Sequence, residues 1–225
     1  MKLLAITTST PRGGVALIDD GELVALVEHE DGMRHAERLF GLCDEALATA
    51  GWSKTSLDAV ACDTGPGSFS GVRIGVASAK GVALALGIPL VGVGSLEAMA
   101  APAFAHAGDV ARVAPVIDAR RGECFLAVYA RDGRTLLEPT VVPTAHATER
   151  ILAHDAWACG AQARDLDGVR LVAPGGCELP SARWIGKLAA ARAKLATTAD
   201  LATLEPVYAR GPDARLPAVA PDYRK

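Results

Sequence analysis

The chain has 225 residues, of which 50% are hydrophobic and 4% aromatic, and its 23 basic and 26 acidic side chains leave a formal net charge of −3. This composition is too apolar for a disordered chain and too mixed for a coiled coil. The near-neutral charge and the scarce aromatics disfavour direct nucleic-acid binding, which needs clustered basic side chains or a stacking platform.

Targeting and metal-binding signals are weak throughout the chain. It has no run of about 18 apolar residues, and the apolar stretch Leu3–Ile6 is too short for a signal peptide. The 5 cysteines form no CxxC pair, and the 5 histidines form no HxxxH or HExxH spacing. We therefore expect a cytoplasmic protein with reduced, buried thiols, no membrane segment and no sequence-local metal site.

The first 105 residues predict the order β-β-β-α-β-α-β-α. Three short β-rich runs separated by glycine-containing turns indicate an antiparallel meander, after which a helical period replaces the alternating one. The predicted elements are strands at Leu3–Thr8, Val15–Ile18 and Glu22–Glu28, a helix from about Met33 to Ala50, a strand at Leu57–Cys62, a helix at Gly71–Leu86, a strand at Pro89–Val93 and a helix from Ser95 to about Ala105.

The second half partly repeats this order. Its predicted elements are strands at Val113–Asp118, Glu123–Ala130 and Thr135–Glu138, a helix at Thr144–Leu152, strands at Trp157–Gly160 and Val169–Ala173, and a helix at Ser181–Leu195. We expect one lobe at 1–105, a degenerate second lobe at 106–205, and a Pro-rich loop or disordered tail at 206–225. This duplicated α/β layout resembles the ribonuclease-H-like fold of the actin, Hsp70 and sugar-kinase superfamily, in which a cleft separates two lobes.

The glycine-rich turn after residue 63 excludes three phosphate or nucleophile motifs. Val72 stands where a Walker A loop requires lysine, and Ser70 stands where GxGxxG requires its third glycine. Phe69 occupies the serine position of a nucleophile elbow. The other ionisable candidates at element ends fit loop capping or solvation better than catalysis; they are Asp63, Glu97, Asp118, Arg120 and Arg121.

Small residues recur every four positions along the second predicted helix, at Gly71, Gly75, Ala79 and Ala83. Glycine inside a helix costs about 1 kcal/mol relative to alanine, so Gly75 needs a packing reason. Two interpretations remain open: this face packs closely on the protein's own sheet, or it contacts a helix of another chain.

The block GPGSFSGVRIG at 65–75, followed by VASAKG, resembles the signature of the TsaB (YeaZ) family. Shorter matches are ITTST at 6–10, GSLEA at 94–98, IDARRGE at 117–123 and EPVYAR at 205–210. The resemblance implies a bacterial, cytosolic subunit of the machinery that makes N6-threonylcarbamoyladenosine at position 37 of tRNA. In that family TsaB binds the catalytic subunit TsaD, and the ATPase TsaE completes the assembly.

The resemblance also implies an interface. The family's first two helices form its homodimer, and the same surface binds TsaD. The implied interface residues are Leu39, Phe40, Cys43, Leu47, Gly71, Val72, Gly75, Val76, Ala79 and Ala83. Gly75→Leu or Ala79→Trp would then abolish association and leave the monomer folded. We expect tRNA to be reached only through the complex, and ATP, Mg²⁺ and metal to sit on partner subunits.

Three residues depart from the catalytic relatives that the resemblance brings in. Thr7 stands where the superfamily's first strand usually ends in an aspartate that organises Mg²⁺ and phosphate. Ser95 and Met99 stand where TsaD carries metal-binding histidines, and neither is a good ligand for such a metal. We therefore expect no catalytic, cofactor-binding or metal-binding residue on this chain. A small-molecule kinase or ATPase of the same superfamily is the alternative hypothesis.

Overall fold

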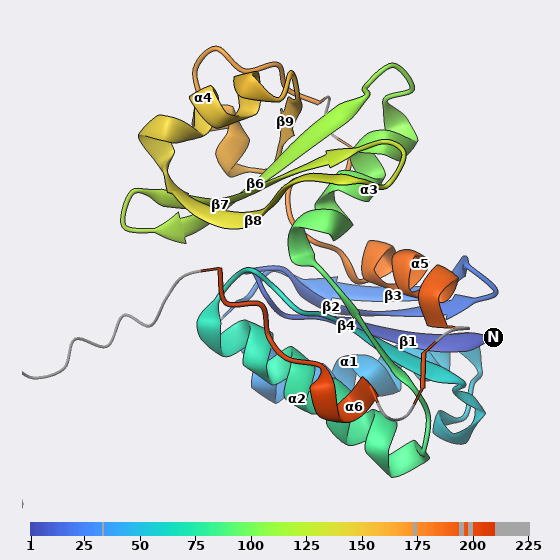
Figure 1. Cartoon of the computed structure of the whole chain (residues 1–225). Helices are drawn as coiled ribbons and strands as arrows, with labels where there is room; N and C mark the ends of the chain where they lie inside the picture. Colours follow the sequence, from blue (N-terminus) through green and yellow to red (C-terminus); the bar gives the residue numbers. More distant parts are fainter. Residues whose placement is uncertain (33, 173–174, 194–195, 198–199, 210–225) are drawn as a thin grey trace, which may run out of the picture.

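A computed structural model places the chain in two lobes, each built on its own sheet (Figure 1). It describes residues 1–32, 34–172, 175–193, 196–197 and 200–209. The predicted helix end at Leu195, and most of the predicted tail, lie outside the described residues. The expected two-lobed α/β fold is confirmed.

The first sheet has the strand order β3-β2-β1-β4-β5. Its strands are β1 (Lys2–Thr7), β2 (Gly13–Asp19), β3 (Glu22–His29), β4 (Ala59–Asp63) and β5 (Leu90–Val93). The first three form the predicted antiparallel meander, whereas β4 pairs in parallel with β1 and β5. The carboxyl ends of β1, β4 and β5 therefore meet at one edge of the sheet, where the cleft lies.

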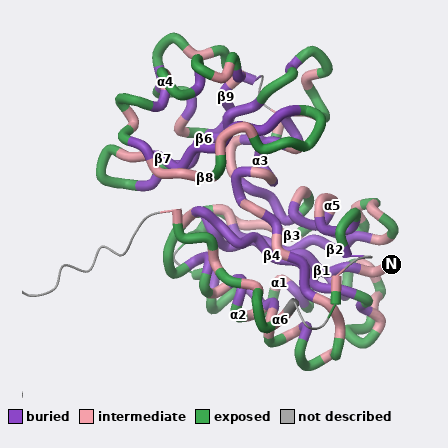
Figure 2. The backbone as a smooth tube through the Cα atoms, in the orientation of Figure 1, coloured by how far each residue is buried: buried purple, intermediate pink, exposed green. Residues whose placement is uncertain are grey.

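Helices cover both faces of this sheet, because its central strands are apolar on both sides. Along β1, Leu4 and Ile6 face α1 (His35–Ala50) and α2 (Phe69–Leu86), whereas Leu3 and Ala5 face α5 (Ala182–Ala193). Figure 1 shows α1 and α2 on one side of the sheet and α5 on the other. Figure 2 shows the buried strands between these layers, with the outer helix surfaces exposed.

The second sheet has the order β8-β7-β6-β9, with α3 (Ser95–His106) on one face and α4 (Thr144–Ala153) on the other. Helix α3, expected in the first lobe at 1–105, therefore packs in the second, because Leu96 and Met99 complete the core of the second sheet. Its strands are β6 (Arg112–Arg120), β7 (Glu123–Ala130), β8 (Thr135–Pro143) and β9 (Trp157–Cys159). The short 3-10 helices η1 (Lys54–Ser56) and η2 (Gln162–Asp165) lie in connections, and α6 (Asp200–Thr203) follows α5.

Three predictions about the second half differ from the structure. Helix α5, expected in the second lobe, packs on the first sheet because Ile185 and Ala189 complete the core beneath β1 and β2. The predicted strand at Val169–Ala173 is reduced to one bridge between Leu171 and Ala158. The third strand of this half runs on to Pro143, five residues beyond its predicted end at Glu138.

The start of α2 also differs from its prediction. This helix begins at Phe69 rather than Gly71, because the Ser68 hydroxyl caps it by accepting a hydrogen bond from Gly71 N. By length and composition α2 is apolar enough to cross a membrane, contrary to the sequence expectation, with 33% of its residues buried. A single such helix is weak evidence, because a helix that covers a protein core passes the same test.

Candidate functional site: the interlobe cleft and the outer face of two helices

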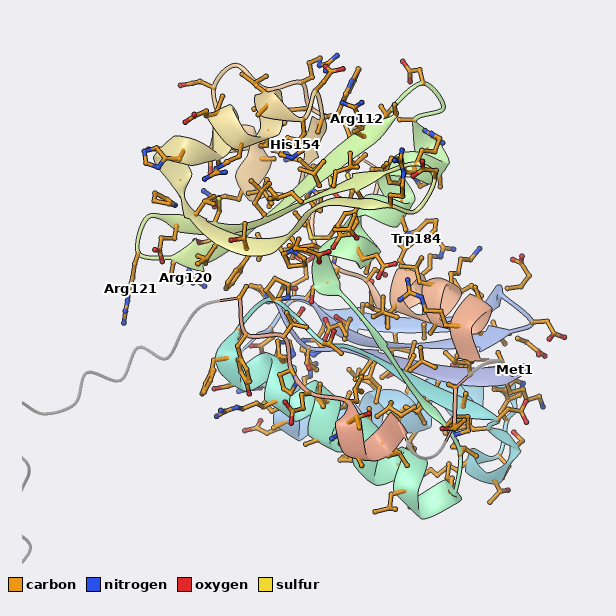
Figure 3. All side chains as sticks on the ribbon, viewed as in Figure 1. Met1, Arg112, Arg120, Arg121, His154 and Trp184 are labelled. Carbon is orange, nitrogen blue, oxygen red and sulfur yellow. The ribbon has the colours of Figure 1, made fainter. Side chains whose placement is uncertain are left out.

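A cleft of about 1150 Å³ lies between the lobes and is lined from both. The first lobe contributes the loop after β1 at residues 9–11 and the glycine-rich turn at 66–69. The second lobe contributes the β6–β7 hairpin, and Figure 3 shows its Arg120 and Arg121 at the tip. Val72 and Arg73 of α2 and the segments 161–162, 178–179 and 207–209 complete the lining. The cleft is large enough for a nucleotide-sized molecule.

Asp63 lies beneath this cleft and is completely buried at the carboxyl end of β4. Its Oδ2 accepts a 2.5 Å hydrogen bond from the Thr7 hydroxyl, whereas Oδ1 has no partner with standard geometry among the described residues. Burial raises the pKa of Asp63, although the nearby Ser9 and Thr7 hydroxyls and the Ser9 and Thr8 N–H groups lower it in part. This carboxyl does not line the cleft, so it is poorly placed to hold Mg²⁺ or accept a substrate proton.

The glycine-rich turn packs closely against the end of β1 in its own chain. Ser68 N donates a 2.6 Å hydrogen bond to Ser9 O, and the Thr8 hydroxyl donates a 2.7 Å bond to Gly71 O. A Cβ on Gly71 would lie 2.1 Å from Thr8 O, and one on Gly67 would lie 2.3 Å from Ser9 O. These glycines therefore let α2 pack directly against the end of β1.

The four-residue repeat of small side chains lies against the protein's own sheet, which decides between the two open interpretations. Nine of the ten predicted interface residues are buried within the chain, and only Phe40 is exposed, at 56%. A Cβ on Gly75 would lie 2.5 Å from the Thr8 hydroxyl oxygen. The expectation that Gly75→Leu or Ala79→Trp would leave the monomer folded is therefore wrong, because both changes put bulk into the core.

The opposite face of α2 is exposed and largely apolar. Phe69 and Leu84 are 58% and 75% exposed, and Ala77, Gly81 and Ala85 lie between them or beside them in solvent. A Cβ on Gly81 would meet nothing within 4 Å. The sequence contains this second four-residue spacing of small residues, but only the structure shows that it faces outward.

Helix α1, which contacts α2, also exposes one large apolar side chain, with the charged residues Glu37 and Asp44 exposed three and four positions from it. Phe40 is exposed beside Gly41, where an added Cβ would again meet nothing within 4 Å. Both glycines are interior to their helices, so each costs about 1 kcal/mol of helix stability relative to alanine, and no described residue packs close to either of them in return. We call the exposed surface formed by Phe40, Gly41, Phe69, Ala77, Gly81, Leu84 and Ala85 the outer face.

The remaining candidates do not form a catalytic cluster. Ser95 and Met99 are buried in α3, and Glu97 pairs with Arg192 of α5. Asp118 pairs with Arg120 within the hairpin, at 3.4 Å. Among the described residues, no group of three or more His, Cys, Asp or Glu side chains could hold a metal ion. All five cysteines are buried, as expected, and burial raises the pKa of Cys43 to about 12.

Comparisons with known proteins identify the family. The family model described as TsaD, tRNA N6-adenosine threonylcarbamoyltransferase, matches residues 29–181. The tRNA threonylcarbamoyladenosine biosynthesis protein TsaB of Escherichia coli is 42% identical over 132 residues, and that of Haemophilus influenzae is 36% identical over 132 residues. These matches cover 59% of this chain and 56% and 55% of the two relatives, so the chain spans about half the length of each.

Solved structures give a longer match. YeaZ from Pseudomonas aeruginosa is 32% identical with a TM-score of 0.77, and the match covers 92% of this chain and 99% of that one. An activator of 2-hydroxyisocaproyl-CoA dehydratase from Clostridium difficile shares the fold alone, at 9% identity and a TM-score of 0.50 over 92% of this chain and 100% of that one. The chain belongs to the TsaD-like family and, within it, to the TsaB (YeaZ) proteins.

Proposed function

We propose that this chain is a partner subunit that binds and supports a TsaD-type catalytic subunit in forming N6-threonylcarbamoyladenosine at position 37 of tRNA. The observation that carries the proposal is the outer face of α1 and α2, where exposed Phe40 and Leu84 flank helix-interior glycines with open space above them. Contiguous exposed apolar surface on a folded protein is typical of a contact with another chain.

The two outward glycines indicate how that contact is made. Gly41 and Gly81 allow a partner's backbone to approach more closely than any other residue would. A docked helix would recover the packing energy that these glycines forgo in the free chain. In the absence of its partner the same surface can pair with a second copy about a two-fold axis, so a homodimer belongs to the proposal.

The cleft chemistry supports a role without catalysis. Asp63, the carboxyl at the end of β4, is completely buried and accepts a hydrogen bond from the Thr7 hydroxyl. Burial raises its pKa. The glycine-rich turn is committed to hydrogen bonds with Ser9 and Thr8. On this proposal ATP, Mg²⁺ and the transferred group are handled by a TsaD-type subunit and a TsaE-type ATPase, tRNA is reached through that cytoplasmic complex, and no membrane is involved.

A reconstitution tests the proposal. The chain should co-purify with the TsaD-type subunit of its own organism, and tRNA modification from threonylcarbamoyl-AMP should require it. Gly81→Leu should abolish co-purification and modification while leaving the melting temperature unchanged or raised, since its side chain enters open space. Gly108→Leu is the matched control, because it adds the same bulk in open space on an exposed loop away from α1 and α2. Full modification without this chain would refute the proposal.

The size of the cleft favours one alternative, a small-molecule kinase or ATPase. Purified chain incubated with Mg-ATP and candidate acceptors distinguishes the two functions. The partner-subunit proposal expects no turnover above a protein-free blank. Turnover that disappears in Asp118→Asn, which changes a residue lining the cleft, would favour the enzyme.

A further inference from the structure

Three large side chains form one cluster at the mouth of the cleft. The Arg73 guanidinium lies over the Phe69 ring, 3.6 Å from its centroid, and Arg73 Nε donates a 3.1 Å hydrogen bond to the Tyr208 hydroxyl. The two rings are 5.8 Å apart between centroids. Phe69 and Tyr208 nonetheless remain 58% and 51% exposed, and Arg73 is exposed as well. The three side chains therefore contact one another while remaining exposed.

Tyr208 reaches this cluster because the segment 200–209, here called the strap, is anchored on the first lobe. Leu204 packs into the core beside Gly92, where a Cβ would come within 2.5 Å of the leucine. Val207 N donates a 2.7 Å hydrogen bond to Thr64 O. Figure 1 shows the strap running along α2 towards the space between the lobes. Two anchors that precede Tyr208 therefore hold this part of the strap on the first lobe.

The charge of Arg73 has no counterpart within the part of the chain that the structure describes. No carboxylate there forms an ion pair with it, whereas Arg120 pairs with Asp118 and Arg12 pairs with Glu30. An exposed cation–π contact contributes only about 0.5–1 kcal/mol, so stability alone does not account for holding three side chains in one arrangement. A guanidinium fixed between two rings is prepared for a second, planar partner such as a carboxylate.

The cluster continues the outer face rather than starting a separate surface. Phe69, Arg73 and Ala77 are spaced four residues apart on α2 and lead to Gly81 on the same exposed side. A helix docked over Gly81 would therefore extend across Arg73 as well. Tyrosine, tryptophan and arginine are enriched among the side chains that dominate binding energy at protein interfaces, because they combine apolar with polar contact.

We propose that Phe69, Arg73 and Tyr208 form the charged end of the docking surface, where Arg73 takes a carboxylate of the TsaD-type partner and Tyr208 positions it. The inference rests on the proposed function and adds a residue-level account of how the partner is recognised. Without the Tyr208 hydroxyl, the Arg73 guanidinium would sample other rotamers in the free chain. Binding would then have to order this side chain, which lowers the affinity.

RNA is a less suitable occupant of the same cluster. Phosphate recognition depends on several clustered cations, yet Arg120, another arginine at this mouth, is already paired with Asp118. Beyond Arg73 the surface becomes small and apolar at Ala77 and Gly81, which suits a packed helix and not a phosphate backbone. The charge pattern therefore favours a protein carboxylate.

Calorimetric titration of purified TsaD-type subunit into this chain, at about 50 and 300 mM salt, tests the inference. Arg73→Glu should weaken the Kd at least about 100-fold and Arg73→Gln about 30-fold, with a smaller salt dependence than the wild type. Tyr208→Phe should weaken binding about threefold or more, but should have no further effect in the Arg73→Gln background. Arg150→Glu, on exposed α4 of the other lobe, is the matched charge-reversal control and should bind normally.

The outcomes separate the two proposals. If Gly81→Leu blocks binding while Arg73→Glu binds as tightly as wild type, the partner-subunit function stands and the carboxylate contact is excluded. Loss of the homodimer alone in Arg73→Glu would make a second copy the occupant, and loss of tRNA binding by an intact complex would make RNA the occupant; either result overturns the inference. Additive effects of Tyr208→Phe and Arg73→Gln would remove the positioning role. Unchanged melting curves establish that each variant is folded.

Discussion

The Thr7 hydroxyl donates a 2.5 Å hydrogen bond to Asp63 Oδ2, which ties the end of β1 to the end of the neighbouring parallel strand β4. Threonine at this position provides one donor and no charge. A second carboxylate here would face Asp63 at hydrogen-bond distance and would be strongly repelled unless a cation lay between them. The pair is therefore a buried, packed contact between the ends of β1 and β4.

Asp63→Asn should change how stability depends on pH. Because the folded-state pKa of Asp63 is raised, the stability that its neutral form provides is complete below the unfolded-state pKa near 4 and is lost as pH rises through the folded-state pKa. Asparagine keeps an acceptor for Thr7 and does not titrate. Urea unfolding between about pH 4 and pH 8 should therefore show the variant gaining on the wild type as pH rises. A stability difference between variant and wild type that stays constant with pH would show that folding does not raise the pKa of Asp63.

Alanine at two glycines of α2 should have opposite effects. Gly71→Ala should destabilise the protein by about 1–3 kcal/mol or more, because its Cβ would lie 2.1 Å from the backbone oxygen of Thr8. Gly81→Ala should stabilise the free chain by about 1 kcal/mol, since the new methyl group meets only solvent. Chemical denaturation of both variants checks this. Equal effects at the two positions would contradict the assignment of inner and outer faces.

Local patterns predicted most of the architecture. The short apolar run at Leu3–Ile6 and the turn at Asp19–Gly21 identify the meander, and Gly51 and Gly87 end their helices in left-handed conformations, as expected. The four-residue spacing at Gly71–Ala83 predicts a close neighbour, which could be this protein's own sheet or another chain. Spacing alone cannot say whether a close neighbour belongs to the same chain, and only the position of Thr8 decides it.

Long-range partners account for what the sequence could not predict. The position of α5 on the first sheet involves Glu28, which lies more than 150 positions earlier in the sequence. Glu28 accepts hydrogen bonds from the Ser181 hydroxyl and Ala182 N at the start of the helix. Contacts of Leu204 with the core and of Val207 with Thr64 hold the segment that carries Tyr208. No periodicity in the sequence connects these residues to the tyrosine. The four-residue spacing of small residues does not predict the outer face, because the buried line that it marks lies on the opposite side of the helix from Gly81.

Glu28 should stabilise α5 as a remote cap. Its Oε1 accepts hydrogen bonds of 2.7 Å from the Ser181 hydroxyl and 3.0 Å from Ala182 N at the start of that helix. Glu28→Ala should cost about 1–2 kcal/mol, the usual range for losing a helix cap. Glu28→Gln should cost less, because its amide oxygen still accepts. Urea unfolding gives both values, and amide exchange at residues 182–186 should accelerate selectively in the alanine variant.

A substitution in the turn of the β6–β7 hairpin, at the mouth of the cleft, should raise the stability of the protein. Arg121 and Gly122 form its two-residue turn, with φ angles of 58° and 75°. Such turns favour Asn-Gly, because asparagine tolerates the left-handed conformation that costs arginine about 1 kcal/mol. Arg121→Asn should therefore raise stability by up to about 1 kcal/mol, whereas Gly122→Ala should lower it. Thermal melts of the two variants measure this; a destabilised Arg121→Asn would show that the arginine side chain stabilises the hairpin by more than its backbone conformation costs.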